Sequence, residues 1–400
     1  MPGATTAGGN TTGPATTLPH PPQAGAVLPD PPRRRVLLAP ITVTPSKPLT
    51  PSHLKGLLWT DVMYRATAQV ADVTYRYSPT TYHLTEQVLG FWEHLDRTHG
   101  DTDYSGLTEE DIGELYVGYR AEDRRARLAA LRPYAEAVEV HGWVHPASAR
   151  VLELWEAHYA RLGMHDPGLL AHQPPELGLE ETIDRLRAVG MCLDQRAYGS
   201  SVFLDATRYG LPLRRIVDAE GRPNYLACAL RELLLLAPRF DETVLLYDRE
   251  LEPDYLLLER TLTEFGATVR RVTLGRVPID GQIRSARHGG WHDHTTGALL
   301  ERAAAEYDDP VVRLGMRLYF IAGLGQGQQQ SFRHEALHQC LTRAAKLLTS
   351  EKPTDPAPLP EVLSRHRRDH LHVNPYRLTS SLLARHRPAP PPELLTAVYL

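Results

Sequence analysis

Cysteine is scarce in this sequence, and long apolar runs are missing from it. The three cysteines, Cys192, Cys228 and Cys340, are far apart and form no CxxC pair. Their spacing argues against a disulfide framework or a thiolate zinc site and fits a reducing cytoplasm. No apolar run approaches the roughly 18 residues that span a bilayer, and the N-terminus lacks the basic-then-apolar layout of a signal peptide. We therefore expect a cytoplasmic protein with no membrane partner.

An excess of positive charge is also missing. The formal net charge is −4, which gives no global basic field for nucleic acid, although a local patch stays compatible with it. With 400 residues the chain is long enough to form one large or two ordinary domains.

Composition and periodicity predict an α/β domain between two unlike ends. Residues 1–32 are mostly Gly, Thr, Pro and Ala, which predicts a disordered tail. Short apolar strands alternate with helical stretches over 33–345, with a helical insertion over about 106–196, and 346–400 form a short C-terminal extension. The predicted strands are 36–41, 201–204, 243–247 and 269–274, and the clearest later helices are 255–265, 311–321 and 334–348.

The segment from Thr44 to Lys55 carries the strongest chemical signal. It follows an apolar strand and opens an apolar-periodic helix, and at such a turn backbone N–H groups and the positive helix end can hold phosphates. Lys47 and His53 lie in this turn. A lysine and a histidine there can stabilise the charge that develops when a carboxylate attacks the α-phosphate of ATP.

This segment resembles the nucleotide-binding signature of class I aminoacyl-tRNA synthetases, in the arginyl form A-K-P-x-H-x-G-H-L-R. The matching positions are Lys47, Pro48, His53, Leu54 and the basic Lys55. Thr50 replaces the first His and Ser52 replaces the Gly. The resemblance implies that Thr50, Ser52 and His53 contact the nucleotide at an altered site.

The resemblance extends over about 36–345 in order and spacing. Segments 111–117, 154–163, 203–210 and 218–226 are similar to further pieces of the arginyl family. The implied fold is a Rossmann-like catalytic domain with a parallel sheet and a helical insertion, which uses ATP with Mg²⁺.

A second family signature, K-M-S-T-R-K-G-N, is similar to residues 283–290. Ser285, Arg287 and Gly289 match, whereas Arg284 replaces the Met. The resemblance implies a loop in which Arg284, Ser285 and Arg287 act on the ATP phosphates and Gly289 lies near the nucleotide; a basic exposed loop without function is the alternative. A third element, G-A-D-x-H, has become 248–252, which counts against ordinary ATP handling.

The substrate positions implied by the resemblance have lost most guanidinium acceptors. Thr44 stands for an Asn, Tyr225 and Ala229 stand for a Y-x-x-x-D pair, and Gln87 is retained. An unpaired guanidinium in such a pocket costs several kcal/mol, so arginine is not the expected substrate. We expect these four residues to line a pocket for a smaller or more apolar carboxylic or amino acid, with a core role for Tyr225 as the alternative.

Bacterial members of the family also carry tRNA-contacting domains at both ends, for which the about 35 leading and about 55 trailing residues leave no room. The resemblance therefore implies a free-standing catalytic domain that joins a small-molecule acid to a small-molecule acceptor, without tRNA. A catalytically silent binding or regulatory paralogue and an aminoacyl-tRNA-dependent transferase are the alternatives. The oligomeric state is not set by the sequence.

Histidine-rich segments suggest a different chemistry. His334-Glu335-Ala336-Leu337-His338 fits the H-E-x-x-H pattern of zinc proteases, with Glu361 as a conceivable third ligand. Because 19 histidines make a chance match easy, we predict no metal site. His366, His370 and His372 lie among arginines and are predicted to be surface residues.

Overall fold

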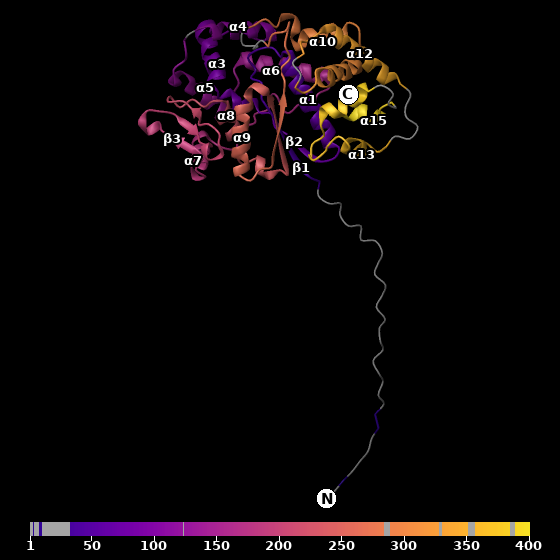
Figure 1. The fold of residues 1–400 in the computed structure, drawn as a ribbon. Coiled ribbons are helices and arrows are strands. Elements are labelled where there is room, and N and C mark those ends of the chain that lie inside the picture. The colour runs from indigo at the N-terminus through magenta and orange to yellow at the C-terminus, as the bar shows by residue number, and fades with distance from the viewer. Residues whose placement is uncertain are drawn as a thin grey trace. The chain divides into compact units, whose positions relative to one another are not determined.

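The computed structural model describes residues 33–122, 124–283, 289–327, 330–350, 357–384 and 389–400, and the isolated residues 3, 8 and 9. Arg33–Leu400 form one compact unit (Figure 1). The tail predicted for residues 1–32 lies almost entirely outside the described residues.

A four-stranded parallel sheet forms the centre of this unit. Its order is β2 (Asp72–Tyr75), β1 (Arg35–Pro40), β6 (Glu242–Asp248), β7 (Val269–Leu274). Val36, Leu37 and Leu38 have no exposed surface, as expected for strands of a parallel sheet covered on both faces. The register pairs Leu38 with Val244, so the carboxyl ends of β1 and β6 meet at one edge although some 200 residues separate them. The predicted α/β class with a parallel sheet is confirmed.

Helices cover the sheet and fill the long connection between β2 and β6 (Figure 1). In the first half they are α1 (Pro51–Ala68), α2 (Pro79–His83), α3 (Glu86–His99), α4 (Glu109–Ala121), α5 (Leu128–His141), α6 (Pro146–Leu162) and α7 (Leu179–Ala188). Later helices are α8 (Tyr225–Leu233), α9 (Glu252–Glu264), α10 (Thr296–Ala304), α11 (Asp309–Arg317), α12 (His334–Thr349), α13 (Leu359–Ser364), α14 (Pro375–Leu383) and α15 (Pro392–Leu394), with π-helical turns at Leu318–Gly323 and Leu395–Tyr399. In the described ranges, no helix combines the length and apolarity that crossing a membrane requires.

A second, antiparallel sheet precedes α8. It consists of β3 (Cys192–Asp194), β4 (Val202–Leu204) and β5 (Arg214–Val217), in that order. The loop after β5 leads directly into α8, whose N-cap is Asn224, with its side chain accepting from the Ala227 N–H at 3.0 Å. This cap fixes the start of α8 and with it the position of Tyr225.

The C-terminal residues pack into the same unit. Val373, Leu378, Val398 and Tyr399 are fully buried. His372 is also buried, and its Nδ1 lies 2.7 Å from a carboxylate oxygen of Glu242 at the start of β6. The predicted surface position of His372 is therefore wrong, because a long-range hydrogen-bond partner, not the neighbouring arginines, determines where this side chain lies.

Candidate functional site

A cavity of about 400 Å³ lies at the carboxyl ends of β1, β6 and β7. The start of α1, the first turns of α8 and the start of α9 complete its wall. The crevice outside the carboxyl ends of parallel strands is where open α/β sheets bind ligands. Eight residues singled out from the sequence line this one cavity: Thr44, Lys47, Thr50, Ser52, His53, Gln87, Tyr225 and Ala229.

The second predicted signature cannot be placed in the same way. Arg284, Ser285 and Arg287 lie outside the described residues. Gly289 is described and has a left-handed backbone, with φ +74°. It is not among the described residues that line the cavity.

His53 is oriented by the beginning of its own helix. Thr50 is the N-cap of α1, and its N–H donates to His53 Nδ1 at 3.2 Å. Because Nδ1 accepts this bond, the neutral ring carries its proton on Nε2. Burial, followed by the nearby cations Lys47 and Arg276, lowers the pKa of His53 to about 3, and the Pro48 carbonyl acts in the opposite direction. His53 is therefore a neutral hydrogen-bond donor at physiological pH.

Two cationic side chains share the cavity wall with His53. The Lys47 Nζ lies 5.4 Å from the centre of the Tyr116 ring, a cation–π contact. Arg276 follows β7, and its Nε lies 3.0 Å from Asp248 Oδ2 at the end of β6. Burial raises the pKa of Asp248 and Arg276 opposes this rise. Sequence reasoning missed Arg276, although its position just past a parallel strand is a signal that points to this edge of the sheet.

Two positions of the first signature, the altered Ser52 and the matching Lys55, connect α1 to the segment after β7. Ser52 Oγ accepts from the Val277 N–H at 3.0 Å. Lys55 is 1% exposed, and its Nζ donates to the carbonyls of Gly275 at 2.9 Å and Gln326 at 3.3 Å. Burial lowers the pKa of Lys55 to about 8, with Asp248 acting against the shift. Both side chains therefore hold the turn at 44–50 against the end of the sheet.

The other part of the cavity is aromatic and carries no free charge in its described wall. Tyr82 and Tyr225 have ring centres 5.3 Å apart, and Tyr255 stacks on Tyr247. Burial raises the pKa of Tyr225, and a hydrogen bond with Thr44 opposes the rise. Tyr225 is half-buried and lines the cavity, so its place is the pocket wall and not the core.

We call this part of the cavity, lined by Tyr82, Tyr225 and Tyr255, the aromatic chamber. Thr44 also connects it to α3. Its hydroxyl accepts from Gln87 Nε2 at 3.2 Å. Ala229, one helical turn after Tyr225, adds only a methyl group to the wall. Hydroxyl and amide groups thus provide the polar contacts here, which suits a ligand group without charge.

Helix α4 packs directly against the turn at 44–50. A Cβ on Gly113 would lie 2.6 Å from Pro48 Cδ and 2.9 Å from the Trp291 ring. Alanine has the higher helix propensity, yet at this position it has no room. The absence of a side chain at Gly113 therefore lets α4 approach the turn that holds Lys47.

We expect Gly113→Ala to lower the free energy of unfolding by about 1 to 3 kcal/mol, because overpacking forces backbone shifts. Gly118→Ala on the same helix is the matched control: it is exposed with no atom within 4 Å of its Cβ, and propensity should raise stability by about 0.5 to 1 kcal/mol. Urea unfolding of both variants measures the difference. Equal effects of the two changes would refute the close approach at Gly113.

The H-E-x-x-H segment does not assemble a metal site among the described residues. His334 and Glu335 begin α12, and His338 Nδ1 lies 3.5 Å from Glu306. In the described part of the chain, the group of three ligand-type side chains that come together is Glu242, His370 and His372. Glu242 there already accepts from the backbone and ring of His372.

Comparison with solved structures finds the same fold in an arginyl-tRNA synthetase. The match to the enzyme of Thermus thermophilus has a TM-score of 0.56 at 15% identity and covers 92% of this chain and 80% of that one. Weaker matches are a putative arginyl-tRNA synthetase from Campylobacter jejuni, with TM-score 0.43, 13% identity and coverages of 92% and 90%, and arginyl-tRNA synthetase from Plasmodium falciparum, with TM-score 0.46, 12% identity and coverages of 84% and 59%. No family model matches the chain, and no curated protein is similar to it in sequence. The synthetase-like fold predicted from the sequence is confirmed.

Proposed function

We propose that this chain, which has an arginyl-tRNA synthetase-like fold, is an ATP-dependent ligase. It would activate a small carboxylic or amino acid other than arginine as the acyl-adenylate and transfer it to a small-molecule acceptor that is not tRNA. The observation that carries this proposal is one cavity with two chemically different ends. Lys47, His53 and Arg276 line one end, and Tyr82, Tyr225 and Tyr255 line the other.

The cationic end suits the phosphates of ATP. A carboxylate oxygen of the acid attacks the α-phosphorus, and the bond to the bridging oxygen breaks as pyrophosphate leaves. Lys47 and Arg276 would offset the negative charge of this step, and the Nε2–H of neutral His53 would donate to a phosphate oxygen. These groups lie at the N-terminus of the 18-residue helix α1, where the helix dipole also favours an anion.

Magnesium would reach this site together with the nucleotide. The described carboxylates of the cavity wall, Asp248 and Asp254, are already paired with Arg276 and Arg214. Phosphate oxygens therefore fit better as ligands of Mg²⁺ than these side chains do. The ion would supply further neutralisation of the phosphate charge.

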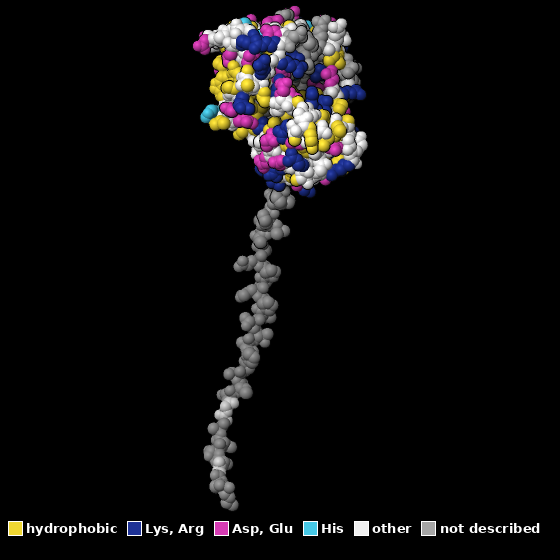
Figure 2. All heavy atoms as spheres, turned by 90° about the vertical axis from the view of Figure 1, so that its left-hand side faces the viewer, with side chains coloured by type: hydrophobic (Ala, Val, Ile, Leu, Met, Phe, Trp, Pro, Cys, Tyr) yellow, Lys and Arg dark blue, Asp and Glu magenta, His cyan; other side chains and the backbone are white. Residues whose placement is uncertain are grey.

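The aromatic end suits an acid with an uncharged side chain. Hydroxyl groups of Thr44 and Tyr225 and the single amide of Gln87 offer hydrogen bonds there, whereas the five donors of a charged guanidinium need several acceptors, carboxylates among them. An acceptor other than tRNA is supported by the surface in Figure 2, where Lys and Arg alternate with Asp and Glu on that face. Polyanion binding would favour one continuous basic area.

A catalytically silent binding protein is the second candidate. It is favoured by Lys55, the basic residue that closes the first signature, because its ammonium is buried and bonded to two backbone carbonyls. Such a protein would bind the acid, or a similar regulatory molecule, without forming the acyl-adenylate.

ATP–pyrophosphate exchange with a panel of the twenty amino acids and related carboxylic acids tests the proposal. We expect exchange with an acid whose side chain is uncharged and none with arginine. ATP at about 100 times its dissociation constant should add about 2.7 kcal/mol to the free energy of unfolding, seen as a thermal shift. Absence of both exchange and shift would refute the ligase and leave the silent binding protein.

A further inference from the structure

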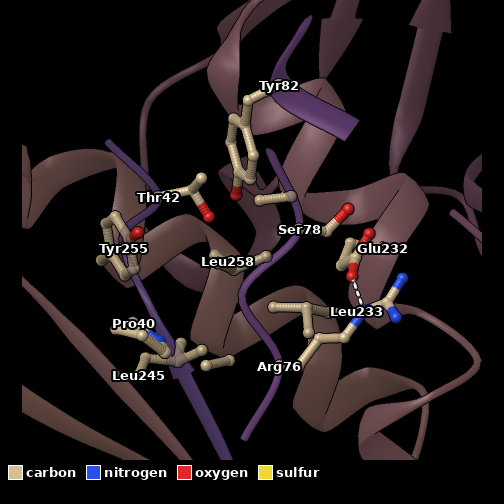
Figure 3. A pocket seen from close by; sticks show the side chains of 12 residues that line it. Pro40, Thr42, Arg76, Ser78, Tyr82, Glu232, Leu233, Leu245, Tyr255 and Leu258 are labelled. Carbon is tan, nitrogen blue, oxygen red and sulfur yellow. Dashed lines mark hydrogen bonds and ion pairs between the residues drawn. The ribbon is translucent and has the colours of Figure 1, made fainter. Parts of the chain in front are cut away.

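The inner end of the cavity is closed by an ion pair between the buried Glu232 and the partly exposed Arg76. Behind the aromatic chamber lies a space of only about 10 Å³, which shares Tyr82, Tyr255 and Leu258 with the main cavity and is also lined by Arg76 and Glu232. Figure 3 shows these side chains, with the Arg76–Glu232 contact as a dashed line. This volume holds no more than about one water molecule. The chain itself therefore fills the place where a longer ligand side chain would extend.

Glu232 belongs to the same helix face as the pocket residues Tyr225 and Ala229. On α8 these positions are spaced i, i+4 and i+7, so they lie above one another. Glu232 is 5% exposed. One carboxylate oxygen accepts from Thr81 Oγ1 at 2.5 Å, and the other accepts from Arg76 Nε. A buried carboxylate of this kind requires a cation.

The Arg76 guanidinium is enclosed by acceptors on several sides. Its backbone N–H donates to Leu38 O at 2.8 Å, which fixes the residue just past β2. Besides Glu232, the guanidinium donates to Gln173 Oε1 at 3.2 Å, to Gln173 O at 3.2 Å and to Pro174 O at 3.0 Å. A carboxylate, an amide and two carbonyls around one planar fork make a site whose geometry is specific for guanidinium.

We propose that Arg76 is the specificity-determining residue of the cavity: its guanidinium occupies a built guanidinium site at the inner end and restricts the substrate to compact acids with an uncharged side chain. Two effects follow from this position. Arg76 neutralises Glu232, so the chamber offers no net negative charge to a cationic side chain, and its guanidinium already uses the acceptors that such a side chain would need. The claim that Arg76 restricts the substrate rests on the proposed function. The claim that Arg76 occupies a guanidinium site does not.

Arg76→Ala in the full-length chain tests the site without any activity. We expect a lower melting temperature, because Glu232 is left buried and unpaired. About 20 mM guanidinium chloride, far below denaturing concentrations, should raise that melting temperature by a few degrees relative to equal NaCl. Wild type should show no such rise. No difference between guanidinium and sodium would refute the site.

Two further variants make the outcome specific. Arg239→Ala removes an arginine that pairs with Glu176 through two hydrogen bonds, but that pair is largely exposed, so guanidinium should not rescue it. In Arg76→Ala/Glu232→Leu the carboxylate is gone, and we expect a folded protein that does not respond to guanidinium. If Arg76→Ala alone yields no folded protein, refolding should succeed with guanidinium present and fail with NaCl; failure with both would refute the site.

The exchange assay then tests the specificity. Arg76→Ala/Glu232→Leu should use apolar acids longer by one or two methylene groups better than wild type does, by about 10-fold or more. If guanidinium rescues Arg76→Ala but neither wild type nor the variants catalyse exchange, the guanidinium site stands and the ligase proposal is refuted. Exchange with an unchanged acid preference would refute the specificity role of Arg76 and keep the ligase.

Discussion

Replacing Arg317 by alanine should lower the free energy of unfolding by about 3 to 5 kcal/mol, because it takes the closest cation away from a buried carboxylate. Arg317 has no exposed surface, and its Nη2 lies 2.6 Å from Oδ2 of Asp61, which is also buried. Its Nη1 donates to Leu162 O at 2.8 Å. The pair thus connects α1 and α11 with the end of α6.

The second oxygen of Asp61 holds another segment. Oδ1 accepts from the His165 N–H at 2.8 Å and lies 3.4 Å from Arg65 Nε. Loss of Arg317 therefore also disturbs the connection after α6. Because α1 begins at the cavity, we expect the damage to reach the site as well as the core.

Urea unfolding of Arg317→Ala, Asp61→Ala and the double variant Arg317→Ala/Asp61→Ala measures the coupling. The double variant should lose much less than the sum of the single changes, since both charges are removed together. Arg239→Ala serves as the exposed control and should change stability by about 0 to 1 kcal/mol. Additive losses would contradict a coupled buried pair.

The second large effect concerns His53. If the ligase proposal holds, His53→Ala should reduce ATP–pyrophosphate exchange about 100-fold, the usual loss when one donor to a developing charge is removed. His53→Asn should retain part of the activity, because its amide still donates. His141→Ala, at an exposed position on α5, should have no effect. Equal exchange in His53→Ala and wild type would remove His53 from the mechanism.

The pH dependence gives an independent check on the charge of His53. Its folded pKa of about 3 lies below the ordinary 6.5, so the folded protein keeps the ring neutral while the unfolded chain gains a proton. The stability contribution is fully present above pH 6.5 and is lost as the pH falls toward 3. The rate of ATP–pyrophosphate exchange by the wild type should therefore show no change near pH 6.5 that is lost in His53→Asn. A change of this kind would mean that the ring of His53 is charged below that pH.

Local patterns were sufficient to predict the elements around the turn at 44–50. The apolar run at 36–41 became β1, and the strand predicted at 269–274 has these bounds as β7. Apolar runs and turn residues act within a few positions of each other, so the sequence shows them directly. The same turn identified Lys47, Thr50 and His53, which lie together at the start of α1. The roles of Arg284, Ser285 and Arg287 stay predictions, since these residues lie outside the described ranges.

The sequence by itself thus determined the α/β class, the synthetase-like order of segments and the residues on one side of the cavity. Tertiary structure decided the rest, because the deciding contacts are long-range. Arg276 reaches the cavity only because β6 and β7 lie side by side, and Arg76 meets Glu232 across 156 positions. No local pattern encodes such a partner. A buried charge can destabilise the protein, bind a ligand or fill a binding site itself. Which of these it does depends on the group that the fold places beside it.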